Sequence, residues 1–216
     1  MLTIPEEFLL LTVADDDGGF VEMSPEAVAA GFIGAAIMEL ALRNRIDSDL
    51  DQIWVHDRAP VGEACVDVVL ERLSSPDFDL DAERLIEQLL TEGERVRANA
   101  LERVCERGIL HETEGRFLWF RRARRYPVTD GREIREVKLR LLDVLLQNGI
   151  PDPRDICLMS LADSCGLFHQ IIPEESFAAV EARFAALARM ELIGLNVSRY
   201  IQIFRATLPH RFMTWC

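Results

Sequence analysis

The stretch SPEAVAAGFIGAAIMELALR, residues 24–43, decides the fold class. Ser24 is a residue type that caps helix N-termini and Pro25 suits the first helical position, so a helix is predicted from there to about Arg43. Its middle, residues 29–38, is apolar on nearly every side, which is typical of the central helix of a hydrophobic core. The small residues there, Gly34 among them, predict close contact with a neighbouring helix.

Further helical patterns lie on both sides of this stretch. Residues 4–13 are apolar but too short to span a membrane, and an acidic turn at residues 15–19 follows, so a buried helix and a loop are predicted. Residues 53–62 predict a short strand and a Pro/Gly turn. Helical periodicity then covers residues 63–73 and 81–107, the second run with a break near Gly93.

A small β element is predicted after Gly108, which is placed to end the preceding helix as its C′ residue. Residues 109–111 and 117–120 show short strand patterns, and Glu114-Gly115 is placed to form the turn between them. The order of helix, glycine and hairpin resembles a winged-helix unit.

The patterns that follow are helical again. Asp130 and Glu133 predict a capping box for a helix with one apolar face. That face is made by Ile134, Val137, Leu141, Val144 and Leu145. Two more helices are predicted over residues 153–164 and 174–191. No repeat or linker divides the chain, so the sequence predicts a mostly α fold, a single-domain helical bundle with a small projecting β-hairpin.

The charge balance is acidic, with 24 Lys and Arg against 37 Asp and Glu in 216 residues and a formal net charge of −13. This balance excludes indiscriminate binding to nucleic acid or anionic lipid. Hydrophobic residues make up 49% of the chain, enough for a substantial core. Because the sequence shows neither a run near the roughly 20 apolar residues of a spanning helix nor a signal-peptide pattern, we expect a cytoplasmic protein.

No catalytic or metal-binding motif stands out. The five cysteines are widely spaced without a C-x-x-C pair, so we expect reduced core thiols and no metal site. His56-Asp57 and Asp163-Ser164-Cys165 come nearest to an oriented base or a nucleophile, but neither has the motif that would accompany one. A phosphate-cradling glycine loop is also missing from the sequence. We therefore expect no enzyme activity and no cofactor.

Residues 116–135 depart from the acidic background. They carry seven arginines against Asp130 and Glu133, a local net charge of +5, beside aromatic residues. Such a surface suits phosphates, a membrane headgroup layer or the acidic face of a protein, and the alternative is ion pairing to the chain's own carboxylates. The candidate anion-binding residues are Arg121, Arg122, Arg124 and Arg125, and the candidate membrane or partner contacts are Leu118, Trp119 and Tyr126.

Five pieces of sequence occur in a distinctive order. They are LTIPEEFLLL (2–11), MELALRNRI (38–46), APVG (59–62), ERGIL (106–110) and YPVTD (126–130). In this order and spacing they resemble the Golgi phosphoprotein 3 family over roughly residues 1–192. The segment 193–216 differs from the eukaryotic members, and we expect it to pack on the same domain. The resemblance implies one mostly α-helical domain with a projecting β-hairpin. In eukaryotic members it implies peripheral Golgi binding through phosphatidylinositol 4-phosphate and retention of glycosyltransferases.

The resemblance also implies a headgroup pocket, made by an aromatic residue before the long apolar helix, an arginine within it and two arginines on a later helix. These positions fall at Ser24, Ile33, Glu94 and Arg97, so only Arg97 is retained. Charge-assisted hydrogen bonds to a phosphate contribute about 1.5–3 kcal/mol each, so their loss predicts weak or altered headgroup specificity.

The sequence supports three functional hypotheses. The first is a non-enzymatic peripheral membrane module whose hairpin arginines, with Arg97 as a neighbour, meet anionic lipid on the inner face of a membrane. The second is a protein interaction or self-association module that uses the same hairpin, in a homo-oligomer. The third is winged-helix-like DNA binding. Acidic residues on the expected recognition helix disfavour it, so we expect no nucleic-acid partner: Glu92, Glu94, Glu102 and Glu106.

Overall fold

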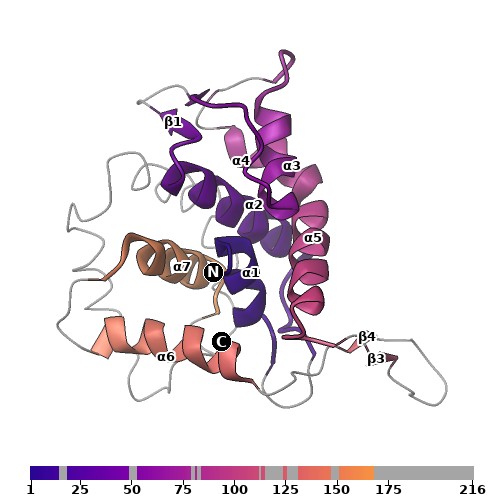
Figure 1. The fold of residues 1–216 in the computed structure, drawn as a ribbon, viewed down its shortest axis with the longest axis vertical. Coiled ribbons are helices and arrows are strands. Elements are labelled where there is room, and N and C mark those ends of the chain that lie inside the picture. Colours follow the sequence, from indigo (N-terminus) through magenta and orange to yellow (C-terminus); the bar gives the residue numbers. More distant parts are fainter. Residues whose placement is uncertain are drawn as a thin grey trace.

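The computed structural model of the chain describes residues 1–14, 19–48, 53–78, 81, 84–111, 113–114, 124–125, 131–146 and 151–167. Over these residues the fold is mostly α-helical with two small antiparallel sheets, which confirms the predicted fold class (Figure 1). The α-helices are α1 (Ile4–Leu11), α2 (Pro25–Leu42), α3 (Ala64–Leu73), α4 (Leu85–Leu89), α5 (Gly93–Glu106), α6 (Arg132–Leu146) and α7 (Pro153–Ser164).

Helix α2 lies at the centre of the molecule, where α1, α3, α5 and α7 all contact it. The Ser24 side chain caps it by accepting a hydrogen bond from the Ala27 N–H at 3.1 Å, and Arg43 is its C-cap, so the predicted bounds are confirmed. By length and composition α2 could cross a membrane, but its apolar side chains are mostly buried among the other helices. Gly34 is buried within it.

Helix α1 is buried along its whole length. Thr3 and Glu6 form a capping box at its N-terminus, which the sequence analysis did not identify. The Phe8 ring meets the Phe32 ring of α2 edge to face, with centroids 5.2 Å apart. After α1, an isolated bridge between Val13 and Phe20 brings the chain back toward α2.

Two glycines allow helices to approach α2 closely. A Cβ built on Gly31 would lie 2.6 Å from the Phe8 ring, and one built on Gly93 would lie 2.6 Å from the Ala29 Cα. Such distances are too short for carbon atoms that are not bonded, so any larger residue at either position would separate the helices. The close helix contact predicted for this stretch is therefore seen at Gly31 and at the start of α5.

The region between α2 and α5 follows the predicted pattern with two differences: a strand is added, and the helix expected from residue 81 begins at Leu85, because Asp81 lies in a β-bridge. The chain does not form a single long helix here. It forms α4, the 3-10 turn η1 (Leu90–Glu92) and α5, so the predicted break near Gly93 is confirmed. The predicted strand is β2 (Ile53–Val55), and it pairs with β1 (Ile46–Ser48), which was not predicted. Ile46 and Ile53 are both buried, so this ribbon is attached to the core.

Strands β3 (Thr113–Glu114) and β4 (Arg124–Arg125) form the predicted hairpin, but in a different register. Glu114 pairs with Arg124, so the predicted turn at Glu114-Gly115 is wrong. No strand spans residues 109–111, where Leu110 alone takes part in a β-bridge. There the Ile109 N–H donates to the Val104 carbonyl at 3.1 Å, so the chain is still completing the end of α5 around Gly108, whose φ is +70°. The predicted strand at residues 117–120 lies outside the described residues.

Helices α6 and α7 confirm two further predictions. Four of the five apolar positions expected on α6 are buried, and Val144 is half-buried. Asp152 caps α7 by accepting from the Arg154 N–H at 2.8 Å, ahead of Pro153. Asp130 and the predicted helix at residues 174–191 lie outside the part of the chain that the structure describes.

Candidate functional site

Arg97, which the family resemblance places in a headgroup pocket, lies on α5 and is half-buried. Its guanidinium carbon lies 4.9 Å from the centroid of the Phe20 ring, and its Nη1 lies 3.3 Å from the Glu94 Oε1. Glu94 is 74% exposed, so this ion pair contributes little to stability. Sequence reasoning missed Phe20, because only the folded chain brings this aromatic ring beside Arg97.

The other positions of that pocket serve the fold. The Ser24 hydroxyl is used as the cap of α2, and Ile33 is completely buried in the core. Neither can stack on a headgroup or pair with a phosphate, and Glu94 would repel one. Over the described residues, the pocket positions therefore supply a single guanidinium group, that of Arg97, which is already stacked on Phe20.

The hairpin candidates are only partly described. Arg124 and Arg125 form β4, beyond the C-terminal end of α5. From Arg97 to the end of α5 at Glu106 the helix rises about 14 Å, so Arg97 is well separated from the base of the hairpin. The remaining candidates lie outside the described residues: Leu118, Trp119, Arg121, Arg122 and Tyr126.

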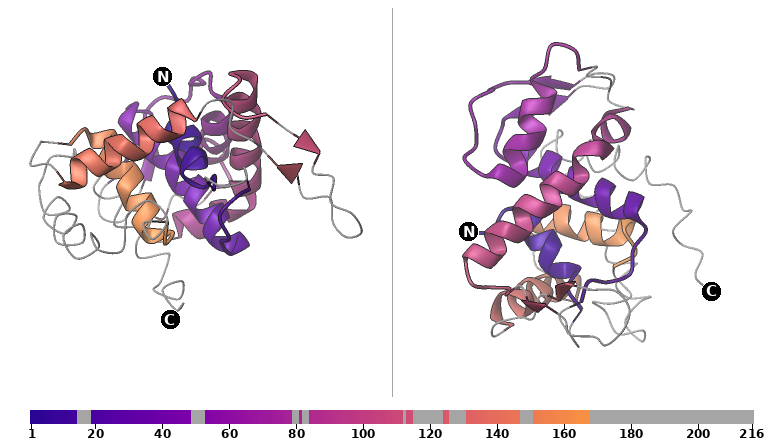
Figure 2. Two further views of the ribbon diagram at one scale, coloured as in Figure 1. Left: turned by 90° about the horizontal axis from the view of Figure 1, so that it is seen from below. Right: turned by 90° about the vertical axis from the view of Figure 1, so that its right-hand side faces the viewer.

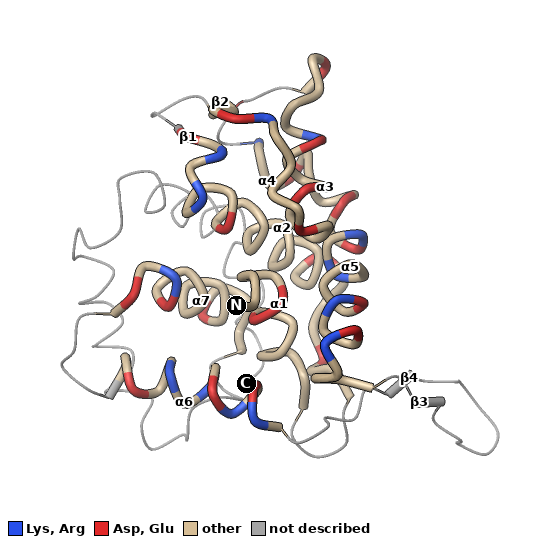
Figure 3. The backbone as a smooth tube through the Cα atoms, in the orientation of Figure 1, with Lys and Arg blue, Asp and Glu red and all other residues tan. Residues whose placement is uncertain are grey.

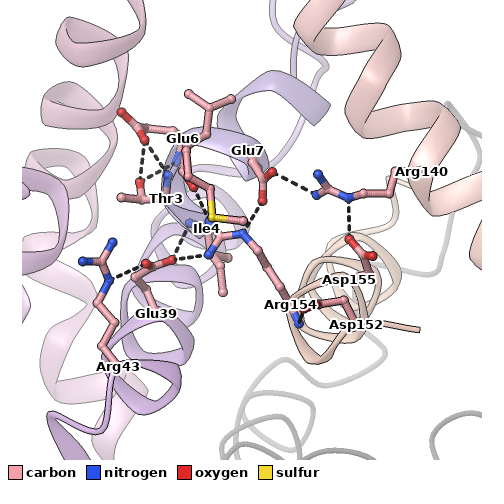
Figure 4. Close-up of polar contacts among 12 residues, drawn as sticks. Thr3, Ile4, Glu6, Glu7, Glu39, Arg43, Arg140, Asp152, Arg154 and Asp155 are labelled. Atoms are coloured by element: carbon pink, nitrogen blue, oxygen red, sulfur yellow. Dashed lines mark hydrogen bonds and ion pairs between the residues drawn. The ribbon is translucent and has the colours of Figure 1, made fainter. Parts of the chain in front are cut away.

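The densest cluster of charges is internal and joins α1, α2, α6 and α7 (Figure 4). Arg154, at the start of α7, points between two buried carboxylates. Its Nε donates to Glu7 at 2.8 Å, its Nη1 donates to Glu39 at 3.0 Å, and its Nη2 donates to the Leu2 carbonyl. Each nitrogen of this guanidinium group therefore has an acceptor, on three different parts of the chain.

Glu39 collects three donors near the end of α2. Its Oε2 accepts from Arg154 and from the Ile4 N–H at 2.8 Å, and its Oε1 accepts from the Arg43 Nε at 2.6 Å. The Ile4 N–H belongs to the first turn of α1, where helix N–H groups have no partner within the helix. Glu39 thus caps α1 from a neighbouring helix and places a negative charge at the positive end of its dipole.

Arg140 of α6 extends the cluster. Its Nη2 donates to Glu7 at 2.9 Å and its Nε donates to Asp155 at 2.5 Å. Burial raises the pKa of the Asp155 carboxyl above its usual value, and Arg140 opposes this effect. Burial also lowers the pKa of Arg140, but the charges and hydrogen bonds of Glu7 and Asp155 outweigh it, so that pKa is raised overall and the guanidinium stays charged.

A smaller group of polar atoms lies on the α5 side of α1. Glu6 accepts from the Thr3 N–H at 2.5 Å, and its other oxygen is buried with the Arg107 Nε 3.9 Å away. The Thr3 hydroxyl lies 3.5 Å from the Cys65 sulfur. Burial raises the pKa of the Cys65 thiol to about 12, so it is a neutral thiol at physiological pH.

Two groups that the sequence analysis considered for catalysis are engaged in other contacts. Burial likewise raises the pKa of Cys165 to about 12, which leaves it a poor nucleophile. In the predicted His56-Asp57 pair, Asp57 forms an ion pair with Arg45, and the His56 Nε2 lies 3.4 Å from Asp47 instead. Among the described residues, no three His, Cys, Asp or Glu side chains are placed to hold a metal ion.

The sequence analysis did not single out the internal cluster. A local signal was present, because Glu6, Glu7 and Glu39 stand within apolar helices where a carboxylate needs a partner. The partner residues Arg140 and Arg154 lie more than a hundred residues further along the chain, so only the fold brings them together.

The described geometry defines a class of protein: a mostly α-helical domain with a basic β-hairpin projecting at one end of its helices. The family model of Golgi phosphoprotein 3 (GPP34) matches residues 4–203. The chain therefore belongs to the Golgi phosphoprotein 3 family, as its five sequence pieces indicated.

Proposed function

We propose that the chain is a non-enzymatic peripheral membrane module that binds anionic lipid headgroups through its hairpin, on the cytoplasmic face of a membrane. The observation that carries this proposal is the position of the hairpin. Strands β3 and β4 lie to one side of the packed helices, beyond the end of α5 (Figures 1 and 2). A basic segment in that position can approach a surface without bringing the acidic body into contact with it.

Local charge supports attachment despite the acidic whole. Residues 116–135 have a net charge of +5 in a chain of −13, and Arg124 and Arg125 of β4 belong to them. Each arginine near an anionic surface contributes about 1 kcal/mol, so four or five support weak, salt-sensitive attachment. The binding we propose is therefore mainly electrostatic.

Headgroup specificity is expected to be low. Ser24 and Ile33 are used by the fold, Glu94 is acidic, and the Arg97 guanidinium is stacked on Phe20. A soluble phosphatidylinositol 4-phosphate headgroup should then bind no better than other anions of similar charge. Calorimetry tests this point. A clear preference for the 4-phosphate isomer would show that this chain has a working headgroup pocket like that of the family.

The membrane proposal is tested by flotation with vesicles of phosphatidylcholine alone and of phosphatidylcholine with phosphatidylserine, at low and high salt. We expect the chain to float only with the anionic vesicles and to be released by high salt, because exposed charges are screened. Failure to float with anionic vesicles at low salt would overturn the proposal.

Self-association through the hairpin is the second candidate. The β3–β4 pair is short and carries arginine, while the rest of the chain is acidic, so charge complementarity between two copies supports it. Light scattering on the wild type and on a hairpin deletion separates the two candidates. If both proteins contain the same number of chains per particle, self-association through the hairpin is wrong.

The exposed side of α5 gives no support to DNA binding. It carries ion pairs between Arg95 and Glu92 at 2.8 Å and between Arg97 and Glu94 at 3.3 Å, and red and blue positions alternate along the helix (Figure 3). With three glutamates and three arginines, α5 has no net positive charge to attract backbone phosphates.

A further inference from the structure

Helix α6 presents a leucine to solvent. Leu139 is 61% exposed, and the other large hydrophobic side chains exposed among the described residues are Met1 and Trp54. Met1 begins the chain, and Trp54 lies on the β1–β2 ribbon at the other end of the molecule from α6 (Figure 1). Leu139 is thus an exposed aliphatic side chain within a long, regular helix.

The orientation of Leu139 is set by the other side of α6. Ile134, Val137, Leu141 and Leu145 are buried in the core. Arg140, the next residue along, is held by Glu7 and Asp155 at 2.9 and 2.5 Å. These contacts fix the rotation of α6 about its axis, so Leu139 cannot turn inward without breaking the internal charge cluster.

The neighbours of Leu139 divide the outer surface of α6 into two flanks. On one flank lie Arg135, one turn earlier, and Leu142, one turn later, with Lys138 beside them. Arg135 is exposed, whereas Lys138 and Leu142 are half-buried. Glu136 and Asp143 lie on the other flank. The first flank therefore combines basic and apolar side chains, which are the types that can contact an anionic membrane.

This flank is on a helix at the same end of the molecule as the hairpin. Figure 1 and the right-hand view of Figure 2 place α6 and the β3–β4 pair at the lower end of the molecule as drawn in Figure 1. Only residues 126–131 separate β4 from α6 in the sequence. A surface that meets the hairpin can therefore also reach α6.

We infer that the flank of α6 formed by Arg135, Lys138, Leu139 and Leu142 is a second contact with the same anionic bilayer. Leu139 enters the layer between headgroups and acyl chains, and Arg135 and Lys138 lie at the level of the phosphates. This inference rests on the proposed membrane function and adds to it an apolar contribution that salt does not screen.

The test compares Leu139→Gln with Leu139→Phe and with Trp54→Gln, an exposed apolar position at the other end of the molecule. All three should melt like the wild type, since substitutions of exposed side chains have little effect on stability. In flotation with phosphatidylserine vesicles, we expect Leu139→Gln to bind about tenfold more weakly, since burying part of a leucine side chain contributes about 1.4 kcal/mol. Leu139→Phe and Trp54→Gln should bind like the wild type.

The outcomes separate the inference from the proposed function. If the wild type does not float, the proposed function fails and the α6 contact fails with it. If the wild type floats and Leu139→Gln floats equally well, only the α6 contact is wrong. A lower mass of Leu139→Gln in light scattering, with unchanged flotation, would assign this flank to contact between copies of the chain and overturn the inference.

Discussion

Helix α2 is held on its two sides by different kinds of contact. Toward α5 the contact depends on shape, because Gly93 lets the helix approach the Ala29 backbone directly. Toward α7 the contact depends on charge, because Arg154 joins Glu39 and Glu7. Both contacts are buried, yet the first is weakened by adding one methyl group and the second by removing one charge.

The difference shows how one helix can specify two neighbours. A contact of small and apolar residues tolerates many partners of the right volume, whereas a buried carboxylate tolerates only a partner that neutralises it. Arg154 lies in the first turn of α7, where the helix dipole disfavours a positive charge. Its pairing with Glu7 and Glu39 offsets that disadvantage, and we infer that it fixes the position of α7.

The largest expected effect is at Arg154. Replacing Arg154 with Met removes the donor from two buried carboxylates and from the Leu2 carbonyl. Breaking a buried pair costs about 3–5 kcal/mol of the free energy of unfolding, and we expect the lower end of this range in urea denaturation because Arg140 still pairs with Glu7 and Arg43 with Glu39. The control, Arg95→Met, changes an arginine that is 64% exposed and should cost less than about 1 kcal/mol. A similar small loss for both variants would mean that the charged contact does not hold α7.

The contact of α5 with α2 should respond to volume. Gly93→Ala places a Cβ 2.6 Å from the Ala29 Cα, and this backbone atom cannot move aside as a side chain would. Overpacking costs about 1–3 kcal/mol, although alanine is the better helix former by about 1 kcal/mol. We expect a net loss in the free energy of unfolding. Glu94→Ala, on the exposed next residue, is the control, and a stabilised Gly93→Ala protein would contradict the close approach.

A smaller loss is expected at Thr3, on the α5 side of α1. Thr3→Ala removes the hydroxyl that bonds Glu6 at 3.0 Å and the side-chain half of the capping box. Loss of such a cap costs about 1 kcal/mol, which a shift in the urea midpoint would report. Thr3→Ser keeps the hydroxyl and should recover most of the loss. If both variants are equally destabilised, the methyl group matters rather than the cap.

Local signals predicted the helices well. Ser24 and Pro25 mark the start of α2, and Gly108 marks the end of α5, because capping depends on residues that are neighbours in sequence. The hairpin register was wrong for a related reason. Ile109 looks like a strand residue, but its N–H completes the end of α5, so the strand begins later.

The long-range contacts could not be read in this way. Phe20 meets Arg97 only in the fold. Likewise, Glu39 shows that a partner is needed without showing that it is Arg154. The family resemblance implied pocket positions, and the fold confirms what local patterns predicted for two of them: Ser24 caps α2 and Ile33 lies in the core.

Unlike the two contacts of α2, the hairpin is expected to add almost nothing to stability. The most direct test of the membrane proposal changes Arg121, Arg122, Arg124 and Arg125 to Gln, against a charge-matched control with Arg58, Arg84, Arg95 and Arg103 changed to Gln. Exposed ion pairs contribute only about 0–1 kcal/mol, so both proteins should keep the melting temperature of the wild type within a few degrees. Flotation with anionic vesicles should be lost in the hairpin variant alone. A hairpin variant that unfolds at lower temperature, while its folded fraction still floats, would show that these arginines are counter-ions of the acidic body and would contradict the account.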